Sequence, residues 1–398
     1  MSKNIAVIGG GASGLVAAIS AARNGAFVTI YEKNSRLGKK ILSTGNGRCN
    51  ISNKNAAISD YHGKDTSFIS DTIDSFWVKE TESFFEELGL LLKTEEDGKM
   101  YPYSNQASSV LDVLRFETER LGILTVYDFE ASKIKKTKNG YIFNSYDGKE
   151  AFAERVILAT GGKAAPATGS VGSGYTLSRM MGHSVSELSP SLVQIKTKGG
   201  FAKGLKGIKL NSKISMGKKS FFGELLFCEY GISGPPVFSI SSHLAEAKDN
   251  TITIDFMPEY DKDAVYQILK KRKQLGVKLE NYFVGMLNKR LGMALLKECE
   301  VIPLSREASS LTDLELEKIC DAIKSFKLIA DGTLSWNNAQ VTSGGVEVVG
   351  INSKTMQSKY NEGLYFCGEL IDIDGDCGGY NLQWAWSSGY IAGYNAAN

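Results

Sequence analysis

The sequence predicts an α/β fold in which a Rossmann-like domain is interrupted by an inserted domain. Three observations predict it. The stretch Ile5–Gly14 is an apolar run that ends in glycines and leads into a segment of small residues. Two later apolar runs, 155–162 and 363–369, also end in glycine-containing turns. The block of about 190–336 between them has no glycine turn of this kind after a strand. We therefore expect the two ends of the chain to share one buried parallel sheet, with this block inserted between them.

Composition excludes several classes of protein. The 398 residues suffice for two or more domains, and a net charge of +2 gives no overall attraction to nucleic acid or membranes. Met1 leads almost directly into the first strand, so we expect no signal peptide. No apolar run has the length of a transmembrane helix, so we expect no membrane span. The six cysteines are scattered and predict reduced thiols in a cytoplasmic protein. The three histidines show no metal-ligand spacing, so no metal is expected. The oligomeric state stays open.

The first turn has the G-x-G-x-x-G spacing of a dinucleotide site. The residues concerned are Gly9, Gly11, Ala12, Ser13 and Gly14. The glycines allow a tight turn, close approach of a pyrophosphate and close packing of helix on strand. The helix expected over 13–23 would present free N–H groups to the phosphates. Glu32 ends the next strand, about twenty residues further on, where a ribose hydroxyl would be met. Together these features predict a bound dinucleotide.

The loop after Glu32 is basic and then polar. Lys33–Lys40 is followed by 41–53, which is rich in glycine, amides and hydroxyls. A surface loop held by its own turns is one interpretation. A ligand-facing loop is favoured, because binding groups concentrate on loops beside a cofactor-binding unit.

The rest of the first domain is predicted from periodicity. We expect helices at 65–89 and 107–121, a hairpin at 91–103, a strand at 123–126 and a meander over 131–152. The strand from Arg155 ends in Ala159, Thr160, Gly161 and Gly162, whose small size would let it pass close to the cofactor. The segment 168–174 then enters a helix that ends at Met181. It is interpreted as a loop over the cofactor edge, with a nicotinamide phosphate site as the alternative.

Pro190 marks the start of the inserted domain. The predicted boundaries are 1–189 with 337–398 for the cofactor domain and 190–336 for a substrate domain, β-rich over 190–257 and helical over 258–325. Residues 190–223 contain eight lysines and no acidic residue. Lysines on exposed strands commonly prevent edge pairing, and this interpretation is favoured. An anionic partner such as RNA is the alternative.

The C-terminal segment indicates which dinucleotide is bound. The strand at 363–369 is followed by Gly378-Gly379 and by a helix expected over 384–395. A helix N-terminus would stabilise the negative charge of a reduced flavin. FAD is suggested because the first unit would hold its ADP part and the C-terminal helix would hold its flavin end. NAD would explain the first turn but not the C-terminal strand and helix.

Four stretches carry a resemblance to a known family. They are Gly9–Gly14, the run from Leu37 through Ser43-Thr-Gly-Asn-Gly-Arg-Cys-Asn50, Gly231-Ile-Ser-Gly-Pro235, and Gln340–Gly345 with Gly368-Glu369 through Gly378-Gly-Tyr-Asn-Leu-Gln383. The chain resembles, over essentially its whole length, the bacterial BaiN/RdsA-type NAD(P)/FAD-dependent oxidoreductases, also called aminoacetone-oxidase-like flavoproteins. One departure is visible, since Cys228-Glu229 stands where the family often has Thr-His, which puts any role of that histidine in doubt.

The resemblance implies a fold and a set of site residues. The fold is an FAD domain of glutathione-reductase type with a β-barrel-like and helical insert. Glu32 and Lys33 would meet the adenosine ribose, and Glu130 and Ala131 the adenine. Gly38, Lys39 and Lys40 would bind the cofactor. The pyrophosphate, ribityl chain and flavin would be lined by Gly45, Asn46, Gly47, Arg48, Cys49, Asn50, Gly368, Glu369, Gly379, Tyr380, Asn381 and Leu382. Arg48, Asn50 and Tyr380 are the candidates for catalysis.

The functional hypothesis is an FAD-dependent oxidoreductase that moves a hydride between a small organic substrate and flavin N5. A reductase supplied by transiently bound NAD(P)H is the first form of it. The alternatives are an amine oxidase that produces hydrogen peroxide and an RNA-binding or tRNA-modifying flavoprotein. Cys49 and Cys377 are interpreted as buried thiols, with a redox disulfide as the alternative.

Overall fold

The computed structural model describes residues 2–244 and 249–398, which form two compact units. The first unit runs to Ser191 and resumes at Ala339–Asn398, and the second is Leu192–Asn338. Of the helices in these ranges, none combines the length and the apolar character that a membrane crossing requires. Each unit is described by itself.

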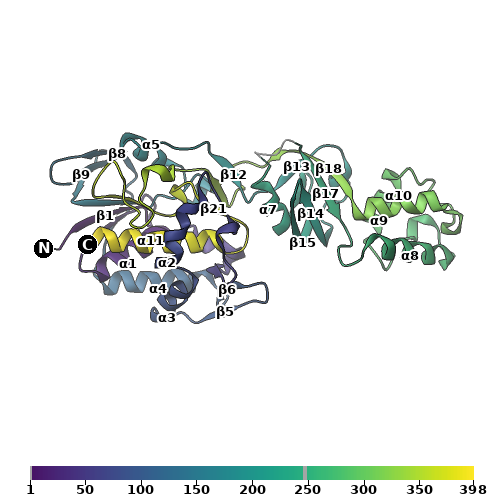
Figure 1. Cartoon of the computed structure of the whole chain (residues 1–398), viewed down its shortest axis with the longest axis horizontal. Helices are drawn as coiled ribbons and strands as arrows, with labels where there is room; N and C mark the ends of the chain where they lie inside the picture. The colour runs from purple at the N-terminus through teal and green to yellow at the C-terminus, as the bar shows by residue number, and fades with distance from the viewer. Residues whose placement is uncertain (1, 245–248) are drawn as a thin grey trace. The chain divides into compact units, whose positions relative to one another are not determined.

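A five-stranded sheet forms the centre of the first unit (Figure 1). Its strands, in spatial order, are β20 (Leu364–Phe366), β11 (Arg155–Leu158), β1 (Asn4–Ile8), β2 (Phe27–Tyr31) and β7 (Leu124–Val126). Every pairing is parallel, and Ile8 lies between Leu158 and Tyr31. Parallel strands buried on both faces read as continuous apolar runs, which is why the sequence revealed them. The predicted α/β class is confirmed.

The first and last helices of the chain touch at their backbones. They are α1 (Ala12–Arg23) and α11 (Tyr380–Ala397). A Cβ on Gly389 would lie 2.4 Å from Ser13 O, and one on Gly393 would lie 2.1 Å from Ala17 O. Only glycine permits this separation. Helix α11 begins four residues before the expected start at Trp384, because Gly379, at φ +105°, is the residue that caps it.

The remaining elements of the first unit surround this sheet. They are the hairpin β5 (Leu92–Thr94) and β6 (Lys99–Pro102), helices α4 (Ala107–Arg120) and α5 (Ser173–Met180), the meander β8 (Ala131–Lys136), β9 (Tyr141–Ser145) and β10 (Glu150–Ala153), and short strands β3 (Ser52–Asn53), β4 (Tyr61–His62), β12 (Ser189–Ser191), β19 (Val341–Ser343) and β21 (Asp374–Gly375). The single helix expected over 65–89 is divided into α2 (Ser70–Ser75) and α3 (Val78–Glu87). The division arises because Phe76 is extended and the Glu80 carboxylate accepts the Trp77 N–H, which starts a new helix.

The second unit contains a closed barrel and a group of helices. The barrel order is β13 (Ile195–Thr197), β16 (Gly231–Ser233), β15 (Lys219–Phe227), β14 (Lys209–Met216), β17 (Thr251–Asp255) and β18 (Phe326–Thr333). The helices are α6 (Phe201–Gly204), α7 (Pro235–Ser241), α8 (Lys262–Arg272), α9 (Lys289–Glu298) and α10 (Asp313–Lys324). The predicted β-barrel-like and helical insert is confirmed. The sequence predicts a helix over about 237–247; α7 ends at Ser241, and residues 245–247 lie outside the described ranges.

The contact between α1 and α11 predicts a stability effect. Gly393→Ala should lower the free energy of unfolding by roughly 1–3 kcal/mol, because the added methyl group forces two packed helices apart. The measurement is urea unfolding of the purified protein followed by circular dichroism. Gly204→Ala is the matched control, since a Cβ there meets nothing within 4 Å. Equal stability of the two variants would contradict the prediction.

Candidate functional site

The carboxyl ends of four parallel strands bring distant segments to one edge of the sheet. The Gly9 N–H donates to Tyr31 O, the Ala159 N–H donates to Ile8 O, and the Cys367 N–H donates to Leu158 O. The glycine turn after β1, Glu32 after β2, the Ala159–Gly162 stretch after β11 and Gly368-Glu369 after β20 therefore lie together. Ligands of open α/β sheets bind at this edge.

The three glycines of the first turn differ in what surrounds them. A Cβ on Gly9 would lie 2.5 Å from Ala159 O, and one on Gly14 would lie 1.9 Å from Gly9 O. The fold itself requires these two glycines. A Cβ on Gly11 would meet no protein atom within 4 Å. Gly11 is the N-cap of α1, whose first N–H groups have no acceptor within the helix. This open space beside free N–H donors fits a pyrophosphate.

Glu32 holds the turn in place. Its Oε2 accepts the Gly10 N–H at 2.8 Å, and its Oε1 accepts the backbone N–H and the side-chain amide of Asn34 at 2.8 and 2.7 Å. The carboxylate is buried. It can accept further bonds, since each oxygen has two lone pairs. Lys33 forms an ion pair with Glu130 at 3.0 Å, which places these two predicted adenosine-side residues next to one another.

A second set of contacts joins Lys40 to the segment after β20 and to β19. Lys40 Nζ lies 2.8 Å from Glu369 Oε2, and Glu369 Oε1 accepts the Thr342 N–H at 2.7 Å. Thr342 Oγ1 accepts the N–H groups of Lys163 and Ala164. The structure thus joins the predicted residues Lys40 and Glu369 through direct contact and adds Thr342, which the sequence analysis did not single out.

The loop 44–50 has an unusual backbone. Asn46 and Cys49 adopt left-handed conformations with φ of 55° and 60°. Such positions cost energy in non-glycine residues and cluster at binding sites. Asn50 Oδ1 is buried and has no hydrogen-bond partner, and a Cβ on Gly379 would lie 2.9 Å from it. An unpaired buried acceptor at the N-terminus of α11 fits a bound group that donates a hydrogen bond there.

Arg48 is engaged by the protein. Its guanidinium lies 2.8 Å from the Glu95 carboxylate and 4.0 Å above the Tyr101 ring centroid. These contacts fix the side chain, so a part in catalysis would require Arg48 to leave them.

The residues at the start of α11 divide into two groups. Asn381 exchanges hydrogen bonds with both backbone groups of Gly375, at 2.7 and 2.9 Å. Gln383 is buried and bonds to Ser52, Thr81 and Ser387. Asn381 thus holds the preceding loop against the helix, and Gln383 joins the helix to β3 and α3. Tyr380 receives the Tyr61 hydroxyl on its carbonyl oxygen at 3.1 Å, and burial raises the pKa of its own hydroxyl to about 12.

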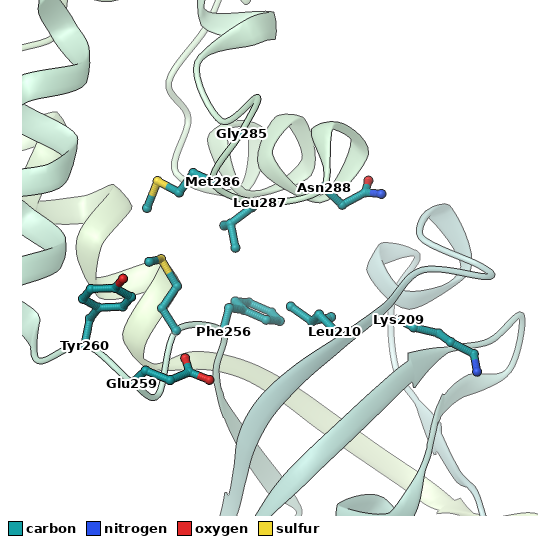
Figure 2. Close-up of a pocket in the computed structure, with 10 residues that line it drawn as sticks. Lys209, Leu210, Phe256, Glu259, Tyr260, Gly285, Met286, Leu287 and Asn288 are labelled. Atoms are coloured by element: carbon teal, nitrogen blue, oxygen red, sulfur yellow. The ribbon is translucent and has the colours of Figure 1, made fainter.

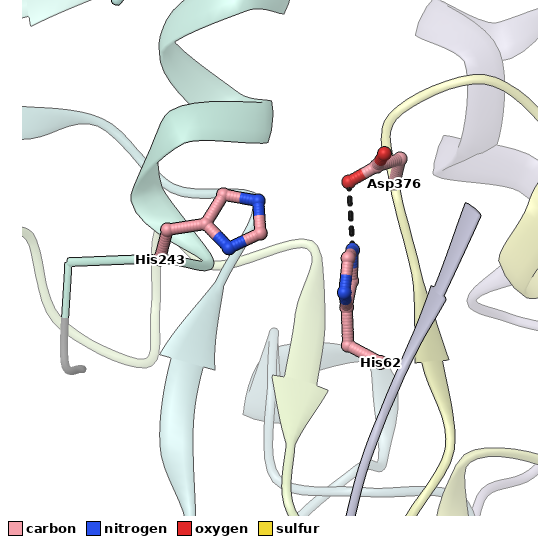
Figure 3. Close-up of side chains that lie close together, drawn as sticks. All are labelled: His62, His243 and Asp376. Carbon is pink, nitrogen blue, oxygen red and sulfur yellow. Dashed lines mark hydrogen bonds and ion pairs between the residues drawn. The ribbon is translucent and has the colours of Figure 1, made fainter. Parts of the chain in front are cut away.

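His62 and Asp376 form a pair that their positions in the sequence did not predict. His62 Nε2 lies 2.9 Å from Asp376 Oδ1 (Figure 3). The strands β4 and β21 that carry this region pair antiparallel, with His62 opposite Asp374. The alternation Asp372-Ile-Asp-Gly-Asp376 was the available signal, since a period of two places three carboxyl groups on one face of a strand.

Burial dominates the electrostatics around this strand. It raises the pKa of Asp374 to about 7 and raises the pKa of Asp372. One oxygen of each carboxyl group is buried without a hydrogen-bond partner. Burial also raises the pKa of Cys49 to about 12 and raises that of Cys377. Both cysteines are free in the structure, and their raised pKa favours the thiol over the thiolate at neutral pH.

A cavity of about 440 Å³ lies within the second unit, between the start of β14 and the turn before α9. Figure 2 shows Phe256, Met286 and Leu287 facing its interior, whereas Lys209 points away. Lys209 is bound to Glu224 at 3.0 Å. Glu259, Tyr260 and Asn288 also line the cavity, so its lining is both apolar and polar.

Gly11 provides a test that separates binding from folding. Gly11→Ala should leave the unfolding midpoint of the FAD-free protein unchanged and weaken FAD binding at least tenfold, about 1.4 kcal/mol, because the methyl group occupies the phosphate space. The measurement is FAD fluorescence quenching on titration with apoprotein.

Gly9→Ala is the contrasting variant, and it should lower stability as well as FAD binding. Unchanged FAD affinity in Gly11→Ala would contradict the placement of the pyrophosphate.

A protein-family model and several known proteins match this chain over nearly its whole length. The family model described as HI0933-like protein Rossmann domain matches residues 3–395. The chain is 41% identical over 407 residues to the 3-dehydro-bile acid delta(4,6)-reductase of Clostridium scindens, which covers 99% of this chain and 98% of the relative. It is 30% identical over 397 residues to the ribosomal RNA dihydrouridine synthase of Haemophilus influenzae, covering 98% and 97%, and 26% identical over 388 residues to that of Escherichia coli, covering 96% and 95%. The chain therefore belongs to the HI0933-like Rossmann family and is an FAD-dependent oxidoreductase.

Proposed function

We propose that this enzyme reduces a carbon–carbon double bond conjugated to a carbonyl group, with NAD(P)H as the hydride donor. The observation that carries the proposal is the 41% identity over 99% of the chain to a bile acid reductase whose name specifies reduction of ring double bonds beside a 3-oxo group. Dihydrouridine likewise differs from uridine by two hydrogens across a double bond next to a carbonyl. The same chemical step therefore underlies the names of all three relatives.

The residues at the sheet edge support one orientation of bound FAD, from its adenosine end to its flavin end. Glu32 and Lys33 would hold the adenosine ribose, with Glu130 and Ala131 beside the adenine. The pyrophosphate would lie against Gly11 and the start of α1. The flavin would be lined by Gly45–Asn50 and Gly379–Leu382. The unpaired Asn50 Oδ1 could accept a hydrogen bond from it. When bound and reduced by NAD(P)H, the cofactor would supply a hydride from its N5 atom.

The N-terminus of α11 has an electrostatic role in this proposal. Its first N–H groups, together with the partial positive charge of an 18-residue helix, favour negative charge beside Tyr380. These groups are fixed before reaction by the Asn381 and Gln383 side chains. Such preorganised donors stabilise charge without rearrangement.

NAD(P)H is proposed to bind only transiently. Within residues 2–244 and 249–398, a single parallel five-stranded sheet carries a G-x-G-x-x-G turn. That turn is assigned to FAD, so a nicotinamide would come to the flavin and leave again.

A second candidate function is reduction of uridine in RNA. Residues 192–338 contain 22 lysines and arginines against 17 aspartates and glutamates, whereas the rest of the chain has more acidic than basic residues. This excess supports an anionic partner for the second unit. Lys206 and Lys209, however, form exposed ion pairs with Glu229 and Glu224 at 2.9 and 3.0 Å, which reduces the charge they offer. A small substrate therefore remains the first proposal.

The reductase proposal predicts a two-stage spectral test. Under anaerobic conditions, NADH or NADPH should bleach the yellow protein, and a conjugated ketone such as 4-androstene-3,17-dione should restore the colour with loss of its double bond. The measurements are flavin absorbance and mass spectrometry of the ketone. Bleaching only by amines, with hydrogen peroxide formed in air, would instead support an amine oxidase.

The RNA candidate predicts binding that depends on salt and on the lysine-rich segment. The triple variant Lys206→Ala, Lys209→Ala and Lys213→Ala should reduce the slope of log affinity against log salt by up to about 2 for single-stranded RNA. Filter binding of a ribosomal RNA fragment provides the measurement. The control replaces Lys133, Lys135 and Lys136, which are exposed on β8 of the first unit, by alanine. Salt-independent binding, or equal effects of both triple variants, would contradict this candidate.

A further inference from the structure

The cavity in the second unit has two walls that face each other. One wall is formed by Leu210 and the segment 256–260, which follows β17, and the other by the segment 285–288, which precedes α9. Figure 2 shows Leu287 across the cavity from Phe256. The volume of about 440 Å³ lies within the range of roughly 300–1,000 Å³ that is typical of small-molecule sites. The proposed function above gives this cavity no role.

Hydrogen bonds within the second unit hold both walls in place. The Lys324 ammonium donates to Met257 O at 2.8 Å and forms an ion pair with Asp255 at 2.7 Å. The Arg272 guanidinium donates to Val284 O at 2.6 Å, directly before the second wall. The cavity is therefore formed before a ligand arrives, as most small-molecule sites are. Because the walls need no ordering on binding, less free energy is lost when a ligand enters.

Apolar side chains form the body of the cavity. Phe256 is buried, and Leu210, Met257, Met286 and Leu287 are half-buried. The part of their surface that water still reaches can be covered by an apolar ligand, and this burial is favourable. Met257 and Met286 can adjust to the shape of a ligand, because methionine is unbranched and polarisable. The lining therefore favours a ligand with a hydrocarbon body.

One side chain provides an unpaired charge at the cavity. Lys209 and Glu259 are the charged residues of the lining, and Lys209 forms an ion pair with Glu224 at 3.0 Å. In the part of the chain that the structure describes, no group forms a hydrogen bond or an ion pair with the Glu259 carboxylate. Tyr260 follows in the chain and is 47% exposed, and the face of its ring attracts cations. The carboxylate and the ring together favour a cationic group.

We propose that this cavity binds an apolar amine, a small molecule with a hydrocarbon body and one protonated amino group. The hydrocarbon body lies between Phe256 and Leu287, and the ammonium group pairs with Glu259. A carboxylic acid of the same shape is disfavoured, because its negative charge would meet that of Glu259. All residues of the site belong to the second unit, so the inference goes beyond the proposed function and does not depend on it.

Methionine methyl signals in an NMR spectrum report on the cavity without turnover. Holoenzyme is labelled with ¹³C at the methyl groups of its nine methionines, and the signals of Met257 and Met286 are assigned by substitution with leucine. The probe is n-octylamine, which is protonated at neutral pH. It should shift these two signals and spare that of Met100, which is buried in the first unit. Unchanged signals of Met257 and Met286, or equal shifts of all nine, would overturn the inference.

Three probes of equal length test the charge. Octylamine should bind about two- to fivefold more tightly than 1-octanol, as expected for an exposed ion pair, and octanoate should bind more weakly than 1-octanol. Isothermal titration calorimetry provides the measurement. Glu259→Gln should lower the affinity for octylamine to that for 1-octanol.

Glu317→Gln is the matched control, since Glu317 is exposed on α10 and lies outside the lining. This variant should leave all three affinities unchanged. Equal affinities of the unchanged protein for octylamine and 1-octanol, or equal effects of the two glutamine variants, would overturn the assignment of Glu259.

Met286→Gln tests the place of the hydrocarbon body. It should weaken the binding of all three probes by about tenfold, because an amide replaces an apolar contact, and it should keep the preference for octylamine over 1-octanol. Circular dichroism should show a folded protein, because Met286 is only half-buried. Unchanged affinities for all three probes would overturn the placement of the ligand in this cavity.

Discussion

Direct backbone contact between the first and last helices is the constraint on which the cofactor unit depends. Gly389 and Gly393 allow α11 to approach the carbonyl oxygens of Ser13 and Ala17. The same contact extends to the strand end, where the Gly368 N–H donates to Ser388 Oγ and the Trp384 indole donates to Gly368 O. Two helix N-termini separated by nearly the whole chain are thereby held in one unit. One lies at the turn proposed for the pyrophosphate, and the other lies at the loop proposed for the flavin.

The site at the sheet edge is built mostly from buried polar groups that hold one another. Glu32 fixes the glycine turn, Glu369 joins Lys40 to Thr342, and Gln383 joins α11 to Ser52 and Thr81. Each of these groups is satisfied by a bond to a different segment. Buried polar networks of this kind rigidify a site when every member is paired. The exceptions, such as Asn50 Oδ1 and one oxygen of Asp374, mark where a ligand or a proton is expected.

The long stretch between the two halves of the cofactor unit folds as its own barrel and helical group. A closed barrel leaves no free sheet edge, so a lysine-rich segment is not needed to prevent edge pairing there. The lysines of β14 instead lie on the outer face and in part form ion pairs. Because the barrel has no free edge, the edge-protection interpretation favoured from the sequence does not account for these lysines. An anionic partner is therefore the second candidate.

The sequence by itself determined the fold class, the dinucleotide turn and the family. These predictions rest on local patterns, which can be recognised in the sequence alone: continuous apolar strands, glycine spacing and the Gly-Gly-Tyr-Asn-Leu-Gln run. It could not distinguish Gly11 from Gly9 and Gly14, because the difference lies in what each Cβ would meet across the sheet edge. In the sequence, His62 is an isolated histidine with no predicted partner. Only the tertiary structure decided that Asp376, more than 300 residues later, lies at hydrogen-bonding distance, because strand pairing and not sequence spacing brings the two side chains together.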